Sequence, residues 1–317
     1  MRIGVDVMGG DFAPKAVLEG AVLAHKELRP EDRIVLIGDS KVIREFLHQN
    51  GVIESLFDIV HTSEFIEMGE NPSKAYSQKP NSTIGLGFTM LQKGELDGFA
   101  SAGNTGAMLV GAMFTSKSIP GIIRPCIAGA IPSLEGHPGI LLDVGINPDA
   151  KPEVLYQYGL LGSLYAEYVY GIQNPKVGLM NIGSEEEKGN IVSKAAFQLM
   201  KNTPDFNFVG NVEGNGFFDN EKVNVIVTDG FVGNIMLKQA ESFYTLIVKR
   251  GMTDSFFEQF NFENYGGTPI LGINHTAVIG HGVSNGYAIK NMILHTQKVV
   301  EVNLIARIKA AFSNDKD

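Results

Sequence analysis

The stretch IGVDVMGGDF, at residues 3–12, contains the pattern from which the fold can be predicted. A short apolar strand, Ile3–Met8, runs into Gly9-Gly10-Asp11, and a helical pattern follows from Phe12 to Leu28. Aspartate is among the residues that cap helices, so we expect Asp11 to be the N-cap here. A strand, a glycine turn and a helix in this order form the first half of a βαβ unit.

The same order recurs along the rest of the chain. Helices are expected to begin near Pro152 and Asn234, and one long helix is expected from about Asn285 to Phe312. Further strands that run into glycine-containing turns are expected at Ile34–Ile37, Gly98–Ala102, Ile140–Val144, Val177–Ile182, Val223–Thr228 and Ala277–Ile279. Strands that alternate with helices indicate parallel connections, and near-continuous apolar strands indicate a sheet covered on both faces. We therefore predict a three-layer α/β/α fold with a mostly parallel sheet, as a single α/β unit over residues 1–317 or as two lobes.

Composition excludes several classes of protein. The 317 residues are 44% hydrophobic, enough for a large core, and the net charge of −9 opposes general nucleic-acid binding, which needs a basic surface. The single cysteine, Cys126, rules out an intrachain disulfide and a multi-cysteine metal site, and we expect it to be a buried, inert thiol. No apolar run approaches the roughly 18 residues of a membrane span, and the first residues lack the organisation of a signal peptide. A cytoplasmic protein is expected.

Two segments do not follow the order of strand, glycine turn and helix. Residues 61–83 are polar and are expected to form an exposed excursion. Residues 243–264 are expected to form an amphipathic projection, since Phe243 and its apolar neighbours precede Lys249-Arg250 and the cluster Phe256–Phe262. Apolar residues beside basic ones suit peripheral contact with an anionic membrane, and exposed aromatic residues equally suit a dimer interface.

The glycine turns are the candidate binding elements. The chain has neither a G-x-G-x-x-G nor a G-x-x-x-x-G-K-[ST] motif, which weakens the case for a nicotinamide or ATP enzyme. Glycine turns before helices can still bind anions through free N–H groups, although glycine also serves simply to form tight turns. Ligands collect at the carboxyl ends of parallel strands, so we expect several turns to converge on one cleft.

Five side chains at or near such turns are candidates for chemistry. Asn234 offers hydrogen-bond donors without a charge, as do Asn104 and Thr105. Lys188, within SEEEKG at 184–189, either reaches a phosphate or belongs to a solvated helix start. His281, between two glycines at a strand end, is either a proton donor or a structural histidine.

Taken together, the turns resemble the phosphate acyltransferase family of bacterial phospholipid synthesis, the acyl-carrier-protein:phosphate transacylases. The matching segments follow the order of that family and cover nearly the whole chain. They are DVMGGD at 6–11 with Ala13-Pro14, SAGNTG at 101–106, GIIRP at 121–125, Leu142–Gly145, DAKP at 149–152, NIGSEEEKG at 181–189, GNVEG at 210–214, DGFVGN at 229–234, Tyr265-Gly266-Gly267 and His281-Gly282. Three departures are Asn215-Gly216, where the family commonly has an arginine, a less basic stretch at Lys74–Lys79, and a shorter segment between Arg250 and Tyr265.

The resemblance implies a fold related to the phosphotransacetylases and the isocitrate/isopropylmalate dehydrogenases, a homodimer, and neither a nucleotide cofactor nor an obligatory metal. It also implies that acyl carrier protein and inorganic phosphate are the substrates and that the acyl phosphate passes to a membrane glycerol-phosphate acyltransferase. Phosphate is already a nucleophile at neutral pH, so positioning and N–H donors can supply most of the catalysis.

The residues expected to carry this chemistry fall into two groups. The catalytic candidates are Lys188 as counter-charge, Asn234 as donor and His281 as proton donor to the departing thiol. The phosphate- and oxyanion-binding candidates are Gly9, Gly10, Asp11, Gly103, Asn104, Thr105, Gly106, Asp229 and Gly230. Two alternatives remain open: a phosphotransacetylase acting on a coenzyme A thioester, and a membrane-associated scaffold for lipid-synthesis enzymes.

Overall fold

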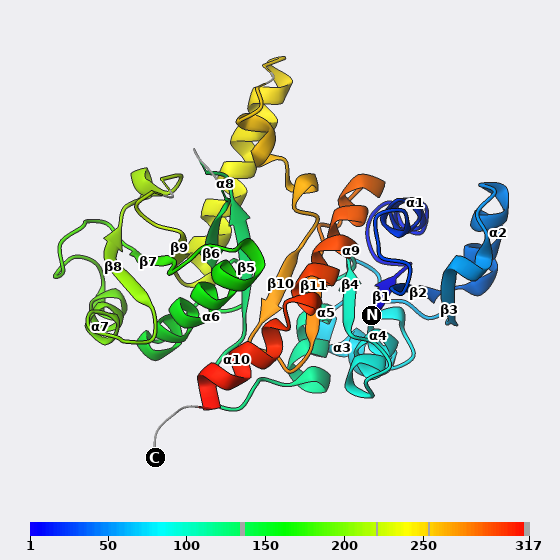
Figure 1. The fold of residues 1–317 in the computed structure, drawn as a ribbon, viewed down its shortest axis with the longest axis horizontal. Helices are drawn as coiled ribbons and strands as arrows, with labels where there is room; N and C mark the ends of the chain where they lie inside the picture. The colour runs from blue at the N-terminus through cyan, green and yellow to red at the C-terminus, as the bar shows by residue number, and fades with distance from the viewer. Residues whose placement is uncertain (134–136, 220, 253, 314–317) are drawn as a thin grey trace. The chain divides into compact units, whose positions relative to one another are not determined.

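The computed structural model describes residues 1–317 apart from 134–136, 220, 253 and 314–317 (Figure 1). The chain divides into two compact units. Unit 1 comprises Met1–Ser118 and Phe262–Ile305, and unit 2 comprises Ile119–Asn261 and Ala306–Asp317. Both are α/β units with mostly parallel strands, as the sequence predicts.

The sheet of unit 1 has the strand order β3-β2-β1-β4-β11-β10 among the described residues. Its strands are β1 (Arg2–Asp6), β2 (Arg33–Gly38), β3 (Phe57–His61), β4 (Gly98–Ser101), β10 (Thr268–Leu271) and β11 (Thr276–Ile279). All neighbours pair in parallel except β10 and β11, which are antiparallel. Val5 lies opposite Leu36 and Ala100 in the neighbouring strands. Successive residues of β1, from Ile3 to Asp6, are all buried although they alternate between the two sides, so this sheet is covered on both faces.

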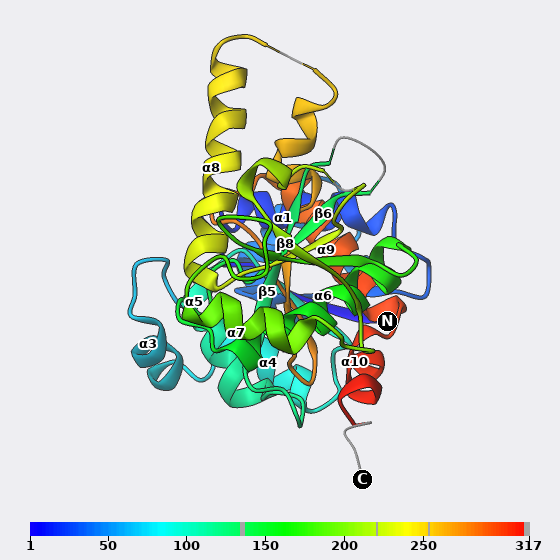
Figure 2. The same ribbon diagram turned by 90° about the vertical axis from the view of Figure 1, so that its left-hand side faces the viewer.

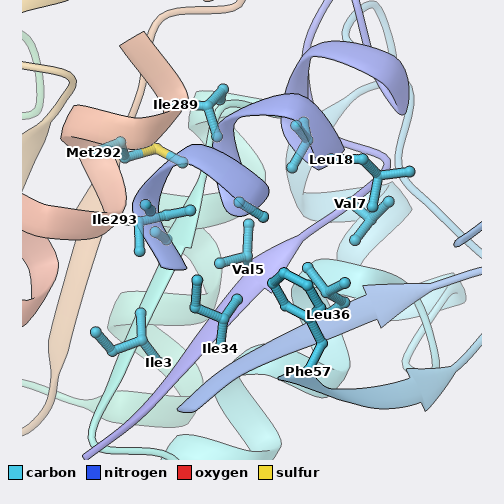
Figure 3. Close-up of a cluster of buried hydrophobic side chains, with 14 of the residues drawn as sticks. Ile3, Val5, Val7, Leu18, Ile34, Leu36, Phe57, Ile289, Met292 and Ile293 are labelled. Carbon is cyan, nitrogen blue, oxygen red and sulfur yellow. The ribbon is translucent and has the colours of Figure 1, made fainter. Parts of the chain in front are cut away.

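The helices of unit 1 enclose its core. They are α1 (Lys15–His25), α2 (Ser40–Gln49), α3 (Pro72–Gln78), α4 (Thr83–Gln92), α5 (Thr105–Gly111) and α9 (Gly286–Glu301), with the short helical turns η1 (Glu54–Leu56), η2 (Ala112–Ser116) and η5 (Phe262–Asn264). Figure 3 shows Val5, Leu18, Ile289 and Met292 gathered in one apolar cluster. Helix α1 approaches α9 so closely that a Cβ on Gly20 would lie 2.5 Å from side-chain atoms of Ile289.

Unit 2 has the strand order β5-β6-β9-β7-β8 in its described part. The strands are β5 (Cys126–Ile131), β6 (Gly139–Leu142), β7 (Lys176–Met180), β8 (Asn207–Val212) and β9 (Val225–Val227), and only β5 and β6 pair antiparallel. Its helices are α6 (Pro152–Tyr170), α7 (Ile191–Met200) and α8 (Gly230–Lys249), with η3 (Gly214–Gly216) and η4 (Phe257–Phe260). Helix α10 (Leu304–Ser313) falls mostly in the part of the chain assigned to this unit. Figure 2 shows α8 as a long helix beside which the following segment turns back.

Three predicted helix boundaries are wrong. Helix α1 begins at Lys15 with Pro14 at its N-cap, so Asp11 does not cap it. Helix α8 begins at Gly230 rather than near Asn234, because the carboxylate of Asp229 accepts the Val232 N–H and starts the helix earlier. The single long helix expected over 285–312 is two helices, α9 and α10, since Asn303 has a φ of 53°, in the left-handed region that ends a right-handed helix.

The polar segment 61–83 contains ordered structure of its own. Helix α3 begins after Asn71, whose side chain accepts the Lys74 N–H at 3.1 Å. The Lys79 ammonium lies 2.7 Å from the Glu70 carboxylate. Ile66 is buried, and most other side chains of the segment are exposed or half-buried. The segment is therefore a folded strap on unit 1.

Candidate functional site

In unit 1, three glycine turns lie together at the carboxyl ends of β1, β4 and β11. A Cβ on Gly9 would lie 2.6 Å from the Gly103 nitrogen, and the Asp11 N–H donates to the Gly282 carbonyl at 2.7 Å. Gly10 has a φ of 111°, which a side chain rarely tolerates. Within this unit the predicted turns do gather at one edge of the sheet, as parallel strands require.

A buried carboxylate connects two of these turns. Asp6, at the end of β1, is 2% exposed; it accepts the Ser101 hydroxyl at 2.7 Å and the Met8 N–H at 3.0 Å. Burial raises the pKa of Asp6 above its ordinary value, and hydrogen bonds from the Thr83 and Ser101 hydroxyls act in the opposite direction. The Ser101 oxygen in turn accepts the Gly103 N–H at 2.9 Å, so Asp6 braces the turn that follows β4.

Asn104 is buried, and its side-chain amide forms hydrogen bonds with other groups of the protein. Its Nδ2 donates to the carbonyls of Glu67, Met68 and Glu70 at 3.0, 3.2 and 3.1 Å, and its Oδ1 accepts the Ala107 N–H at 3.0 Å. The amide therefore caps α5 and holds residues 67–70 against it. The donors that the sequence suggested for a ligand are directed to the protein's own carbonyls.

The remaining candidates of unit 1 surround the same turns. Thr105 and Asp11 are exposed, and Gly106 packs so closely on α3 that a Cβ there would lie 2.3 Å from Pro72 Cγ. His281 is half-buried, and its ring centroid lies 4.5 Å from that of Phe262. The structure thus places His281 next to Gly282 and the Gly9–Asp11 turn.

Unit 2 has a second buried carboxylate, immediately after β6. Asp143 is 0% exposed and accepts the N–H groups of Ile127 at 3.0 Å, Ile146 at 3.2 Å and Asn147 at 2.7 Å. The Asn147 Nδ2 also donates to it at 3.1 Å. Burial raises the pKa of Asp143, and the N–H donors oppose that shift. Asp143 thereby fixes the loop between β6 and α6.

The start of α8 packs directly on that loop. The Gly230 N–H donates to the Asn147 carbonyl at 2.8 Å, and a Cβ on Gly233 would lie 2.0 Å from the Asp143 carbonyl oxygen, so only glycine permits this approach. The Asn234 Nδ2 donates to the Val144 carbonyl at 3.0 Å. The described residues provide no second acceptor for this amide, which leaves one N–H of Asn234 for a ligand.

Lys188 lies in the loop between β7 and α7. Its side chain is half exposed, and its ammonium is 4.0 Å from the Glu185 carboxylate. Its carbonyl accepts the Asn181 Nδ2 at 3.1 Å, which fixes the loop at its base. The ammonium is only weakly paired and can take a second anionic partner.

A cavity of about 910 Å³ opens beside this loop, entirely within unit 2. It lies among the end of β7 and the first turns of α6, α7 and α8, and it is lined by Lys151, Asn181, Asn190 and Asp229, among others. Sequence reasoning assigned no role to Lys151, Asn181 or Asn190. The available signal was their position, because each lies just after a strand or just before a helix.

Sequence reasoning also gave no role to Asp6, Ser101, Asp143 or Asn147. Asp6 and Asp143 could have been found as carboxylates at the ends of apolar strands, where a buried charge requires several donors. The predicted burial of Cys126 is confirmed, and burial together with nearby Asp143 raises the pKa of its thiol. No cluster of His, Cys, Asp and Glu suited to a metal ion occurs in the described part of the chain. Nor is any helix there long and apolar enough to span a bilayer.

Comparisons with known proteins agree along nearly the whole chain. Residues 1–307 match the model of a family described as fatty acid synthesis protein. A phosphate acyltransferase of Desulfitobacterium hafniense (strain DSM 10664 / DCB-2) is 40% identical over 329 residues, covering 98% of this chain and 97% of its own. A phosphate acyltransferase of Dictyoglomus thermophilum is 39% identical over 336 residues, covering 100% of this chain and 99% of its own.

Two solved structures share the fold. A phosphotransacetylase from Streptococcus pyogenes gives a TM-score of 0.67 at 19% identity, and EutD phosphotransacetylase from Staphylococcus aureus gives 0.63 at 16% identity. Each comparison covers 94% of this chain and 94% of the other. The predicted relation to the phosphotransacetylase fold is confirmed.

Proposed function

This chain belongs to the phosphate acyltransferase family of fatty acid and phospholipid synthesis, and on that basis we propose that it transfers a long-chain acyl group from acyl carrier protein to inorganic phosphate. The observation that carries the proposal is the 40% identity to a phosphate acyltransferase across 98% of the chain. The enzyme is an acyltransferase, and the finer proposal concerns its two substrates.

The reaction requires no nucleophile from the protein. An oxygen of phosphate attacks the thioester carbonyl, the new C–O bond forms, and the C–S bond breaks as the thiolate takes up a proton. The buried Cys126, with its raised pKa, is suited to no covalent role. The protein's work is to hold the phosphate dianion and to stabilise the oxyanion with fixed donors.

The site residues support this chemistry in different degrees. Asn234 is the best supported, because one N–H of its amide is left for an oxyanion. The turns at Gly9–Asp11 and Gly103–Gly106, and the helix start at Asp229-Gly230, are proposed as phosphate and oxyanion sites. Asn104 is proposed to position the turn after β4 rather than to touch the substrate. Lys188 remains the proposed counter-charge, and His281 the proposed proton donor to the thiol.

A single assay tests the proposal. The purified enzyme is incubated with palmitoyl-acyl carrier protein, with and without inorganic phosphate, and acyl phosphate is trapped with hydroxylamine. Product is expected only with phosphate, and chelator should leave the rate unchanged. A requirement for ATP, NAD or a divalent metal would contradict the proposal. Turnover of palmitoyl-coenzyme A alone would instead identify a phosphotransacetylase that acts on coenzyme A thioesters.

We propose further that the end of α8 and the segment after it form a contact surface. Phe243, Leu246 and Met252 are each about half exposed and lie beside Lys249-Arg250. Two occupants fit: an anionic membrane, from which the acyl phosphate would reach a membrane glycerol-phosphate acyltransferase, or a second copy of the chain in a homodimer.

Liposome flotation with anionic lipids, before and after the double change Phe256→Glu/Phe257→Glu, decides between these two occupants. Lost flotation with an unchanged oligomeric state supports the membrane. Dissociation to monomers with residual flotation supports the dimer. Failure of the parent protein to float would contradict the membrane proposal.

A further inference from the structure

The cavity of unit 2 has an apolar wall that the proposed phosphate chemistry does not use. In its lining, Leu155 from α6 and Leu179 from β7 are buried, and Val192 from α7 and Met236 from α8 are half-buried. Phosphate gains nothing from such side chains. A hydrocarbon chain is stabilised by them, because each methylene group that they bury makes transfer from water more favourable.

The opening of this cavity is also apolar. Ile182, which lines it, is 81% exposed, and Val232 is 36% exposed. Ile191, the first residue of α7, is 87% exposed beside the lining residue Asn190. Exposed aliphatic side chains grouped around a hollow mark a surface that a ligand covers.

The lining of the cavity also has a polar part. The first turns of α6, α7 and α8 meet there, with Pro152 at the start of α6 and with Asn190 and Asp229 as the N-caps of α7 and α8. Helix starts carry partial positive charge, which suits the polar end of an amphipathic molecule. The lining also holds one cation, Lys151, and two carboxylates, Asp149 and Asp229, so it carries no net positive charge.

The volume is compatible with a long chain. The cavity measures about 910 Å³, toward the upper end of the roughly 300–1,000 Å³ of ligand pockets. An acetyl group would leave most of it empty. Met236 is an adaptable wall residue, since an unbranched thioether can rearrange around chains of different length.

We propose that this cavity binds the hydrocarbon chain of the acyl group, with Val192 and Met236 setting the chain length that is accepted. The proposal rests on the proposed function and adds a binding site for the acyl chain. The polar end of the acyl group lies toward the starts of α6, α7 and α8, and the chain lies along the apolar wall.

The first experiment measures chain-length selectivity. Val192→Trp and Met236→Trp place a bulky ring in the cavity, and Leu199→Trp is the matched control, because Leu199 is exposed on α7 outside the lining. The ratio of kcat/KM for palmitoyl- over butyryl-acyl carrier protein should fall roughly 10- to 100-fold in the two cavity variants, since lost methylene contacts are worth that much discrimination. The control should keep the parent ratio. An unchanged ratio in both cavity variants overturns the proposal, as does an equal loss for both substrates.

The second experiment needs no turnover, so it separates this proposal from the proposed function. Palmitoyl-acyl carrier protein with a diazirine at the end of its chain is irradiated with the parent enzyme, and the labelled peptides are identified by mass spectrometry. Labels within 179–193 and 228–236 support the acyl-chain site even if no acyl phosphate forms. Labels confined to other parts of the chain overturn it. Absence of acyl phosphate from every thioester would contradict the proposed function alone.

Discussion

Each unit buries one aspartate at the end of a strand, and the two carboxylates are held in different ways. Asp6 in unit 1 accepts the hydroxyls of Ser101 and Thr83 and the backbone N–H groups of Met8 and Gly9. Asp143 in unit 2 accepts only N–H groups, three from the backbone and one from the Asn147 amide. A hydroxyl can rotate and reverse its role, whereas an N–H can only donate. We therefore expect the turn of unit 1 to tolerate the loss of the aspartate charge better than the turn of unit 2.

The two asparagines after the glycine turns show a parallel difference. Asn104 distributes its amide hydrogens among three carbonyls, and Asn234 gives one to Val144 and keeps the other. The same residue type is therefore a brace in unit 1 and a candidate donor to the substrate in unit 2.

The largest expected effect tests the asparagines. Asn234→Ala should lower kcat about 100- to 1,000-fold, because one fixed oxyanion donor is worth that much, and it should change the free energy of unfolding little. Asn104→Ala should do the reverse, with a stability loss of about 1–2 kcal/mol from the missing cap and a smaller loss of rate. Steady-state kinetics and urea unfolding on both variants measure this. Equal rate losses at matched stability would remove the distinction between the two residues.

The second-largest expected effect is on the free energy of unfolding and tests the two buried aspartates. Asp143→Asn turns an NH₂ group toward N–H donors and should cost about 3 kcal/mol or more of stability. Asp6→Asn should cost about 1 kcal/mol, because the Ser101 hydroxyl can accept from the new amide. Chemical denaturation of both variants gives the comparison. Stability losses of similar size in the two variants would show that rotation of the Ser101 hydroxyl does not compensate for the substitution of Asp6.

Removal of the exposed Lys188 charge should affect rate rather than stability. Lys188→Ala should lower kcat/KM more than tenfold if the ammonium contacts phosphate, since charge-assisted contacts are among the strongest polar ones. Lys188→Arg keeps the charge and should recover part of the rate. The apparent KM for phosphate, measured at saturating acyl carrier protein thioester, is the diagnostic readout. A rate unchanged in Lys188→Ala would leave the counter-charge to another residue, with Lys151 the next to test.

Both aspartates should give stability an unusual dependence on pH. Their folded pKa values are raised by burial, so the folded state binds more protons than the unfolded state just above pH 4. The stability they contribute is complete below the unfolded pKa and is lost as pH rises through the folded pKa. The parent should therefore lose stability relative to Asp6→Asn as pH increases from about 4. A parent-minus-variant difference that is flat with pH would show that Asp6 is not protonated in that range.

The smallest expected effect concerns Cys126. Cys126→Ser should retain most of the activity, because the thiol is buried and protonated. A water-soluble disulfide reagent should leave the thiol unmodified in the folded parent enzyme. The same reagent should modify the thiol once the enzyme is unfolded. A Cys126→Ser enzyme that is folded but inactive would indicate covalent catalysis by Cys126 instead of direct attack by phosphate.

Much of the fold could be predicted because its signals are local. An apolar run followed by glycine specifies a strand and a turn through residues that are neighbours in sequence, and β1, β2, β6 and β7 fall where such runs predict them. Helix ends were harder to place. The division of 285–312 into α9 and α10 depends on one backbone conformation, at Asn303, that the apolar spacing does not reveal.

The sequence by itself determined the alternation of strands and helices, the glycine turns and the family, because each depends on residue types in a fixed order. Only the tertiary structure decided what the side chains at those turns do. Asn104 meets its acceptors across 34–37 positions of chain and Asn234 meets Val144 across 90, so their different roles cannot be found in either local sequence. The apolar cavity likewise exists only where β7 and the starts of α6, α7 and α8 meet, since burial is a property of packed surfaces rather than of residues in order.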